Sequence, residues 1–318
     1  MLAEKTVRSY TIKYALAQAL FWMALCAIKG FMSVLLLDRG YTNTQVGIIL
    51  AVSSIVTVFM QPAVASFADK HREIPLKNII SVFAAVGSLL AALTIFLTTE
   101  SLALTVVMIF SVIIITVLYP LINSLYVMLG ESGIKINYGV GRAAGSLGYA
   151  LFSLLLGKLL ETAPTVILPL SGLFLLIAVT LTTLLLWDKR AISGKDKTDI
   201  SPDTSSEEGA LGVFQFMKRN LRYMLFLFGV ALVFYNHTNV SDYLVQVVSA
   251  VGGTSTDLGT AVFICAIVEL PAMLFFNSLL KKFSCRTLLR ISAVSFTVKH
   301  LLVLFATNVT TLLISQVF

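Results

Sequence analysis

One segment of the chain occurs twice, first as Gly40-Tyr41-Thr42-Asn43-Thr44-Gln45-Val46-Gly47 and again as Gly252-Gly253-Thr254-Ser255-Thr256-Asp257-Leu258-Gly259. Both copies fit the pattern GxTxTxxG and lie 212 residues apart (252 − 40). In each copy a loop glycine precedes a Thr-x-x-Gln or Thr-x-x-Asp capping pattern that opens a helix, and a small residue then permits close helix packing. The sequence therefore predicts two halves of related structure.

The composition around the two copies is that of a membrane protein. Hydrophobic residues make up 58% of the 318 residues and charged residues only 12%, with a mean hydropathy of +0.92. Ordinary soluble domains are about 45–50% apolar and about a quarter charged. A soluble domain is therefore excluded, and the net charge of +7 does not indicate nucleic-acid binding.

Nine apolar runs are long enough to cross a bilayer, which takes about 20 residues, and a tenth begins near the end of the chain. Runs two and eight follow the repeated segment, and the same offset relates runs one and three to runs seven and nine. The predicted fold is all-α and polytopic. The nine runs are 14–37, 45–68, 78–98, 102–129, 142–160, 164–187, 221–248, 257–280 and 288–307.

The repeat also predicts how the chain is divided. Residues 1–187 are expected to form a six-helix bundle, and residues 188–220 a cytoplasmic linker that is too polar to fold alone. Residues 221–318 would then be the incomplete second bundle, spans seven to nine and the start of span ten. Two six-helix halves are typical of secondary transporters, and projecting the repeat gives a full length of roughly 400 residues, so the chain is expected to be a fragment.

The basic residues predict the orientation. If the N-terminus is cytoplasmic, the loops on that side hold all but four of the 23 lysine and arginine residues, the exceptions being Arg39, Lys158, Lys29 and Lys299. A multi-pass protein of the inner (plasma) membrane with a cytoplasmic N-terminus is expected. The basic pI then reflects contact with anionic lipid.

The three cysteines, Cys26, Cys265 and Cys285, show no CxxC or Cys/His spacing. Neither a disulfide framework nor a metal site is predicted, and no cofactor is expected. The three histidines form no HExxH motif, and no nucleophile–base motif is evident, so the chain is not expected to be an enzyme.

Charged residues inside the apolar runs are candidates for function, because a charge at mid-bilayer costs about 2.5–3.5 kcal/mol on insertion scales. The candidates are Lys29, Arg142, Glu269 and Lys299. Asp242 lies near enough to the outer end of its span to reach water. A pair of Glu269 and Lys299 that only holds adjacent helices together is the alternative.

Polar residues form stripes on several spans, since residues three, four and seven apart share a helix face. In span five the stripe lies beside a separate glycine face of Gly141, Gly145 and Gly148 that would let a neighbouring helix approach. Amide and phenol groups suit a hydroxylated solute, although helix–helix hydrogen bonding is the alternative for each stripe, and an ordinary interior role is the alternative for His237. The stripes are Arg142, Ser146, Tyr149 and Ser153; Asn236, Asn239, Tyr243 and Gln246, with His237 nearby; Tyr119, Asn123 and Tyr126; Ser54, Thr57 and Gln61; and Ser292, Ser295 and Lys299.

The run YGVGRAAGSLGY at 138–149, the stretch from Gln61-Pro62 to Asp69-Lys70, and Glu269-Leu270 resemble the major facilitator superfamily. The likeness is specifically to the lactose-permease-like oligosaccharide:proton symporters and the related 3-phenylpropionate permeases, and it runs along the whole chain. It implies that Arg142 and Glu269 contact substrate, that Tyr149 stacks on a sugar ring, and that Lys299 occupies the place of a functional arginine. Asp69 and Lys70 would belong to a loop with a conformational role.

Departures from that group leave galactoside specificity unsupported. Ser124 stands where lactose permease has a substrate-binding glutamate, Ala272 where it has an asparagine, and Asn236 and Asn239 where it has two aspartates. The group's proton-site histidine and acid on span ten would follow Phe318.

The resulting hypothesis is a secondary transporter that carries a small polar, sugar-like solute by alternating access. Its transport is expected to be coupled to protons, and the protein is expected to be a monomer in the bilayer. An organic-carboxylate carrier is the first alternative, because Lys29, Arg142 and Lys299 against Glu269 would give a net charge of +2 (3 − 1) if all are charged and face one cavity. A non-transporting receptor or inactive fragment is the second. The expected substrate-binding residues are Arg142, Tyr149, Glu269, Lys29, Asn123, Tyr126, Asn236, Asn239 and Tyr243; the expected proton-coupling residues are Glu269, His237 and Lys299.

Overall fold

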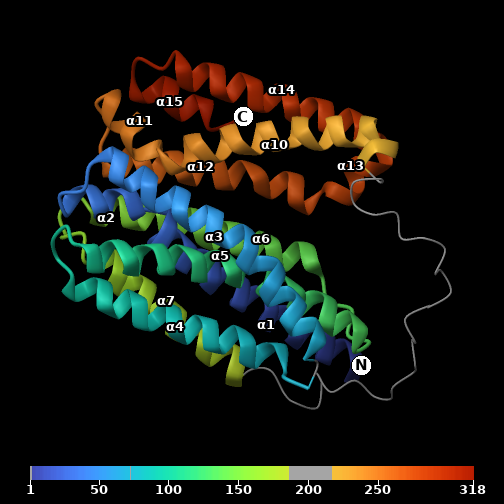
Figure 1. Ribbon diagram of the computed structural model, residues 1–318. Helices are drawn as coiled ribbons and strands as arrows, with labels where there is room; N and C mark the ends of the chain where they lie inside the picture. The colour runs from blue at the N-terminus through green and yellow to red at the C-terminus, as the bar shows by residue number, and fades with distance from the viewer. Residues whose placement is uncertain (1, 72, 186–216) are drawn as a thin grey trace.

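The computed structural model describes residues 2–71, 73–185 and 217–318, and these residues form helices joined by short turns, without strands (Figure 1). In chain order the helical elements are α1 (Leu2–Leu25), the π-helical turn η1 (Cys26–Gly30), α2 (Met32–Asp38), α3 (Asn43–Lys70), α4 (Leu76–Phe96), α5 (Leu102–Glu131), α6 (Tyr138–Leu159), α7 (Ile167–Leu185), α10 (Leu221–Asp242), α11 (Leu244–Ala250), α12 (Ser255–Leu274), α13 (Phe276–Lys282), α14 (Cys285–Leu304) and α15 (Val309–Ser315).

Nine helical stretches within the described residues are long and apolar enough to cross a membrane, which confirms the nine predicted spans. The first stretch, Thr6–Asp38, runs through α1, η1 and α2. Most of the predicted linker at 188–220 lies outside the described residues. The all-helical polytopic fold is as predicted.

The first six spans form one bundle, the N-terminal half. In it α4 packs against α5 and α7, α1 against α6 and α7, and α3 against α5. Its core includes Tyr14, Phe21, Ile80 and Leu118, all fully buried. Large side chains on the outer surface are exposed, as with Phe59 at 73%, and this is the surface that would face lipid.

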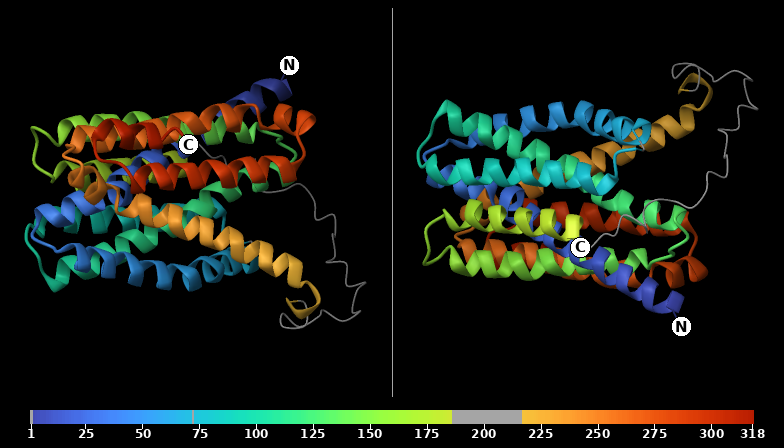
Figure 2. Two further views of the ribbon diagram at one scale, coloured as in Figure 1. Left: turned by 90° about the horizontal axis from the view of Figure 1, so that it is seen from above. Right: turned by 90° about the horizontal axis from the view of Figure 1, so that it is seen from below.

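Elements α10 to α15 form the C-terminal half, which lies beside the first bundle (Figure 1). The two halves meet chiefly where α6 packs against α12. None of the 22 residues of α10 is buried, and Lys299 is the one buried residue of α14. Figure 2 shows α10, in yellow and orange, projecting obliquely from the bundle on the side away from the N-terminus.

Both copies of the repeated segment have the local structure that their sequence predicts. Gly40 and Gly252 have φ angles of 94° and 77°, in the left-handed region that glycine adopts without strain. Thr42 is the N-cap of α3 and Thr254 the N-cap of α12. The backbone N–H of Thr254 donates to Asp257 Oδ2 at 2.8 Å, as a capping box requires.

The two halves are joined at the end of the bundle opposite the N-terminus, which we call the far end; the turns at 39–42, 160–166 and 251–254 lie there (Figure 1). One buried apolar cluster crosses between the halves, and it includes Phe31 and Val46 from one half and Leu244 and Leu258 from the other. Side-chain hydrogen bonds also cross, among them one from Gln246 Nε2 to Asn43 Oδ1 at 3.1 Å and one from Thr254 Oγ1 to Glu161 Oε1 at 3.0 Å.

Glycines allow the backbones to meet at this junction. A Cβ on Gly157 would lie 2.9 Å from the Cα of Gly259, and a Cβ on Gly259 would collide with the carbonyl oxygen of Ser153. Gly47, the equivalent of Gly259 in the first half, lies against the hydroxyl of Tyr243. The close packing predicted for the last residue of each repeated segment is therefore confirmed.

Spans one and seven, predicted as continuous helices at 14–37 and 221–248, are both interrupted. In span one the π-helical turn inserts a residue, with Phe31 N–H donating to the Cys26 carbonyl at 3.0 Å. In span seven the direction changes at Tyr243. The φ and ψ angles are −108° and 14° at Phe31 and −105° and 17° at Tyr243, and these two residues are again 212 apart (243 − 31). The repeat thus extends to the helix breaks.

Candidate functional site

A cavity of about 330 Å³ lies between the two halves and is lined by residues of both. Its far-end wall belongs to the apolar cluster that joins the halves, through Leu244 and Leu258. The polar and aromatic residues of its wall are Trp22, Lys29, Ser146 and Tyr149 from the N-terminal half, and His237, Ser241, Asp242, Glu269 and Gln316 from the C-terminal half.

A larger cavity, of about 520 Å³, lies between α10 and α14 within one half. Its lining is mainly apolar, and His300 is the single titratable residue among those described that line it. The smaller cavity is the candidate site, because it holds the charged residues and draws on both halves.

Aromatic rings form the wall contributed by the N-terminal half. The centroid of the Trp22 ring lies 5.9 Å from that of Tyr149 and 5.6 Å from that of Tyr119, both in edge-to-face geometry. The indole Nε1–H donates to Gln18 Oε1 at 3.1 Å, and Gln18 Nε2 donates to Asn123 Oδ1 at 2.9 Å. These bonds fix the indole, so the cavity presents a rigid flat apolar surface.

Arg142 lies behind this wall. Its guanidinium carbon is 4.5 Å from the Trp22 ring centroid and 5.9 Å from that of Tyr119, within cation–π distance. Its Nη1 atom is buried and has no hydrogen-bond acceptor among the described residues. Part of the hydrogen-bonding capacity of Arg142 is therefore unused among the described residues.

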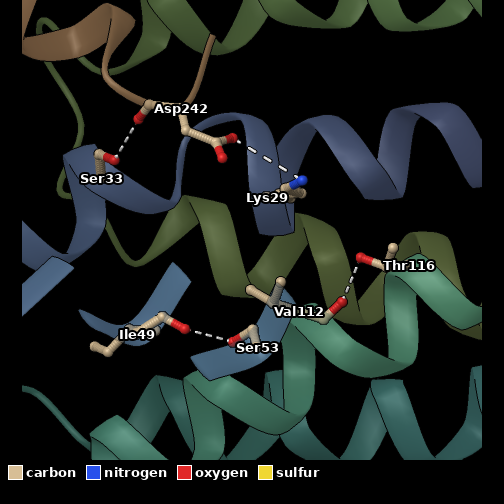
Figure 3. A network of polar contacts seen from close by, with 7 residues as sticks. All are labelled: Lys29, Ser33, Ile49, Ser53, Val112, Thr116 and Asp242. Atoms are coloured by element: carbon tan, nitrogen blue, oxygen red, sulfur yellow. Dashed lines mark hydrogen bonds and ion pairs between the residues drawn. The ribbon is translucent and has the colours of Figure 1, made fainter. Parts of the chain in front are cut away.

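The charged groups fall into two sets. Lys29 Nζ lies 3.9 Å from Asp242 Oδ1, an ion pair between the halves (Figure 3). Glu269, from α12, is acted on by the charges of Lys299 and Arg142. Lys299 is 3% exposed, and its ammonium donates to Cys265 Sγ at 3.3 Å.

Asp242 was predicted only to reach water near the outer end of its span, and the structure places it in the cavity wall. Its side chain is only 18% exposed and lines the cavity. It is the last residue of α10, and the break at the following residue, Tyr243, directs it to Lys29. The sequence contained one signal for this contact: an acid and a base near the same depth in repeat-related spans.

The predicted site residues are only partly brought together. Lys29, Tyr149, Glu269 and His237 line the cavity. Arg142 and Lys299 contact residues that line it, Trp22 and Cys265. Asn123 lies one residue further away, because it is bonded to Gln18, which in turn holds the Trp22 indole.

The remaining predicted residues lie away from the cavity wall. Asn236 lines the apolar cavity between α10 and α14, and Tyr243 packs on Gly47. Tyr126, 37% exposed, contacts the rings of Tyr14 and Tyr138. Asn239 is half-buried, and Asp69 and Lys70 are exposed at the end of α3. The stripe predicted on span seven is divided because the helix turns at Tyr243.

Two residues were missed: Trp22, which lines the cavity, and Gln18, which is buried behind it and accepts the hydrogen bond of the indole. With Tyr14 they lie at positions i, i+4 and i+8 of α1, so they share a face, and Gln18 Nε2 also donates to the Tyr14 hydroxyl at 2.7 Å. This spacing is visible in the sequence. It was hidden by the absence of a charge in the stripe.

Comparison with protein families decides the membership. A model of the MFS_1 like family matches residues 11–318, nearly the whole chain. The chain belongs to the MFS_1 like family. Membership confirms the resemblance to the major facilitator superfamily, and the MFS_1 like family is one of transporters rather than enzymes. The protein is thus a multi-pass membrane protein of the secondary-transporter class.

Solved structures show the same fold. One is a nucleoside transporter, NupG, as a D323A mutant, with a TM-score of 0.74 and 16% identity over 97% of this chain and 78% of that chain. A second structure of NupG gives a TM-score of 0.65 and 17% identity over 98% of this chain and 77% of that chain. No curated protein sequence matches the chain.

Proposed function

We propose that this member of the MFS_1 like family transports a neutral solute that carries a polyhydroxylated ring, a sugar or a nucleoside, by alternating access coupled to protons. The observation that supports it best is the cavity between the halves, where a rigid aromatic surface lies beside two separate sets of charged groups. Repeat-built carriers bind their solute at such an interface.

The cavity chemistry suits a hydroxylated ring. Trp22 and Tyr149 offer an apolar surface on which the face of a ring can lie. The carboxylates of Asp242 and Glu269 can accept hydrogen bonds from hydroxyls, and Lys29 can donate them. The volume of about 330 Å³ falls at the lower end of the roughly 300–1,000 Å³ typical of ligand pockets, which favours a monomeric solute over a long oligomer.

The organic-carboxylate alternative is weakened by Asp242. The sequence placed three cations against one acid, but Asp242 is a second acid and is paired with Lys29. The excess positive charge around the cavity falls to one. A neutral solute is also consistent with the two similar structures, both of a nucleoside transporter.

For proton coupling we assign Glu269 the central role. It lies in the cavity wall, and the charges of Lys299 and Arg142 act on it, so its charge state and the solute would compete for the same partners. His237 lines the same cavity on the opposite helix, α10. In the orientation predicted from the basic residues, the far end is extracellular, the N-terminus is cytoplasmic, and the protein is a monomer in the plasma membrane.

Uptake by inside-out and right-side-out vesicles tests the proposal. Labelled uridine, methyl β-D-galactopyranoside and 3-phenylpropionate are offered to vesicles that contain the protein, with and without a protonophore. We expect saturable accumulation of at least one ring solute, abolished by the protonophore and by Glu269→Gln but not by Glu131→Gln, an exposed acid at the end of α5. Accumulation of 3-phenylpropionate alone would support the carboxylate carrier. Folded protein that accumulates none would support the non-transporting alternative.

A further inference from the structure

We infer that Lys29 and Asp242 together bind two neighbouring hydroxyl groups of the solute, so that each half holds one side of a vicinal diol. This inference rests on the proposed function and names the part of the solute that the far-end side of the cavity recognises. Both side chains line the cavity, one from each half, and the close-up in Figure 3 shows them directed at each other across the interface.

The distance between the two groups leaves both with unused hydrogen-bonding capacity. Charge-assisted hydrogen bonds between an ammonium and a carboxylate are about 2.7–2.9 Å long, whereas Lys29 Nζ and Asp242 Oδ1 are 3.9 Å apart. Among the described residues neither charged group makes another ion pair or a hydrogen bond; Ser33 Oγ donates instead to the backbone oxygen of Asp242 at 3.2 Å. A ligand can therefore bind to both groups without displacing another partner.

Different cations act on the two acids of the cavity. Lys29 is the charged residue that acts on Asp242, while Lys299 and Arg142 act on Glu269. The charges of both acids act on the Tyr149 hydroxyl, which also packs against Gly30. A ring lying on Tyr149 would thus be near both sets of charges.

The backbone at the pair is what repeat-built carriers use for binding. Lys29 belongs to the π-helical turn of span one, and Asp242 ends α10 at the break in span seven. Substrate sites in such carriers are typically formed where spanning helices are discontinuous, and π-helical turns are frequent at functional sites. The two breaks are equivalent in the repeat, so the halves bring the same structural feature to the solute from both sides.

A vicinal diol matches this pair chemically. Each hydroxyl has one hydrogen to donate and two lone pairs to accept. One hydroxyl can donate to the Asp242 carboxylate while the other accepts from the Lys29 ammonium. Ribose in a nucleoside and a pyranose both carry such neighbouring hydroxyls, so the chemistry is common to the two proposed classes of solute.

Binding of deoxy analogues to protein in lipid nanodiscs tests the inference. Uridine is compared with 2′-deoxyuridine and 3′-deoxyuridine, and methyl β-D-galactopyranoside with its 3-deoxy and 4-deoxy analogues, by isothermal titration calorimetry. In the unmodified protein, loss of one hydroxyl should weaken binding of the recognised solute roughly 10-fold or more, as expected for a hydrogen bond to a charged group. The two series also distinguish a nucleoside from a sugar.

The same titrations on Lys29→Met and Asp242→Asn decide the residues. We expect each variant to bind the diol at least roughly 10-fold more weakly and to lose most of its discrimination against the deoxy analogues. Lys158→Met and Glu131→Gln remove exposed charges elsewhere, so these two control variants should keep both the affinity and the discrimination of the unmodified protein. Should either pair variant fail to fold, the exchanged pair Lys29→Asp with Asp242→Lys keeps the charge balance, and restored discrimination there supports the inference.

The failures are distinguishable. Discrimination that persists in both Lys29→Met and Asp242→Asn, or equal binding of deoxy and parent solutes by the unmodified protein, would overturn the diol site and leave the proposed function standing. If folded protein binds neither series, the proposed function and the diol site both fall.

Discussion

Arg142 and Glu269 come from different halves, α6 and α12. Glu269 lies in the cavity wall, whereas Arg142 lies over Trp22, a residue of that wall. The Arg142 guanidinium is planar and can stack on an aromatic ring while its edge still donates hydrogen bonds, which an ammonium cannot do in the same way. These two residues therefore differ in how far substitution at each should affect the fold.

Replacing Glu269 with Gln should abolish coupling and weaken solute binding by roughly 10- to 100-fold, the loss expected for a hydrogen bond to a charged group. The variant should still insert and fold, because Glu269 is an exposed side chain in the cavity wall and its removal leaves no cavity in the core. Solute titration and counterflow in vesicles measure the two effects. Unchanged proton-driven uptake would rule out the role assigned to Glu269.

Replacing Arg142 with Lys keeps the charge and removes the planar stack on Trp22. We expect weaker solute binding and a change in tryptophan fluorescence, measured with Trp187→Phe as background so that Trp22 is the only tryptophan. Lys135→Arg, an exposed exchange of similar size, is the control. Fluorescence and affinity identical to the parent would contradict the positioning of Trp22 by Arg142.

At the scale of helices, the glycine face predicted on α6 is used against α1. A Cβ on Gly145 would lie 2.5 Å from Trp22 Cδ1, one on Gly141 would collide with the ring of Tyr14, and one on Gly148 would lie 3.3 Å from the Ala19 oxygen. The close helix approach predicted from the spacing is confirmed. However, its partner at Gly145 is a residue of the cavity wall, so packing and binding are not separate there.

Gly145→Leu should therefore lower stability and solute affinity together. Overpacking costs about 1–3 kcal/mol, and here the added side chain must displace the Trp22 indole. Gly229→Leu is the matched control, since a Cβ on that glycine of α10 meets nothing within 4 Å. Thermal unfolding in detergent and solute titration provide the measurements; a melting temperature equal to that of the control would show that α1 and α6 can separate without cost.

The sequence predicted those features that depend on neighbouring residues. The caps at Thr42 and Thr254 and the positive φ angles at Gly40 and Gly252 follow from local hydrogen bonding and sterics. The break at Tyr243 does not, because no proline or glycine marks it, and the Tyr243 hydroxyl lies against Gly47 of the other half, which is 196 positions earlier in the chain. For that reason the sequence did not place Asp242 in the cavity wall, and Asn236 lines the cavity between α10 and α14.

At the scale of the whole molecule, Glu161 joins the halves at the far end. It follows α6 and accepts a hydrogen bond from Thr254, the N-cap of α12. The hydroxyls of Thr256 and Thr254 lower the pKa of Glu161 below its ordinary value of 4.5. The carboxylate form is thus the one that stabilises the junction.

The lowered pKa fixes the sign of a pH effect. The contribution of Glu161 should be fully present above pH 4.5 and be lost as the pH falls through the lowered value. The melting temperature of the parent should therefore fall more steeply below pH 4.5 than that of Glu161→Gln. The glutamine can accept the same hydrogen bond without titrating. Lys158 and Asp257, the other charged groups at the contact, are present in both proteins. Parallel pH profiles would exclude this contribution.

The crossing of Gly157 and Gly259 has a mechanical consequence. At this crossing the two backbones touch with no side chain between them. A change in the crossing angle therefore needs no side chain to repack, so the crossing can serve as a pivot. Tyr138, at the other end of α6, is 19 residues from Gly157, a lever arm of about 28 Å at 1.5 Å per residue. A rotation of about 10° at the glycines would swing that end by about 5 Å, so a slight tilt at the crossing becomes a displacement as large as a side chain.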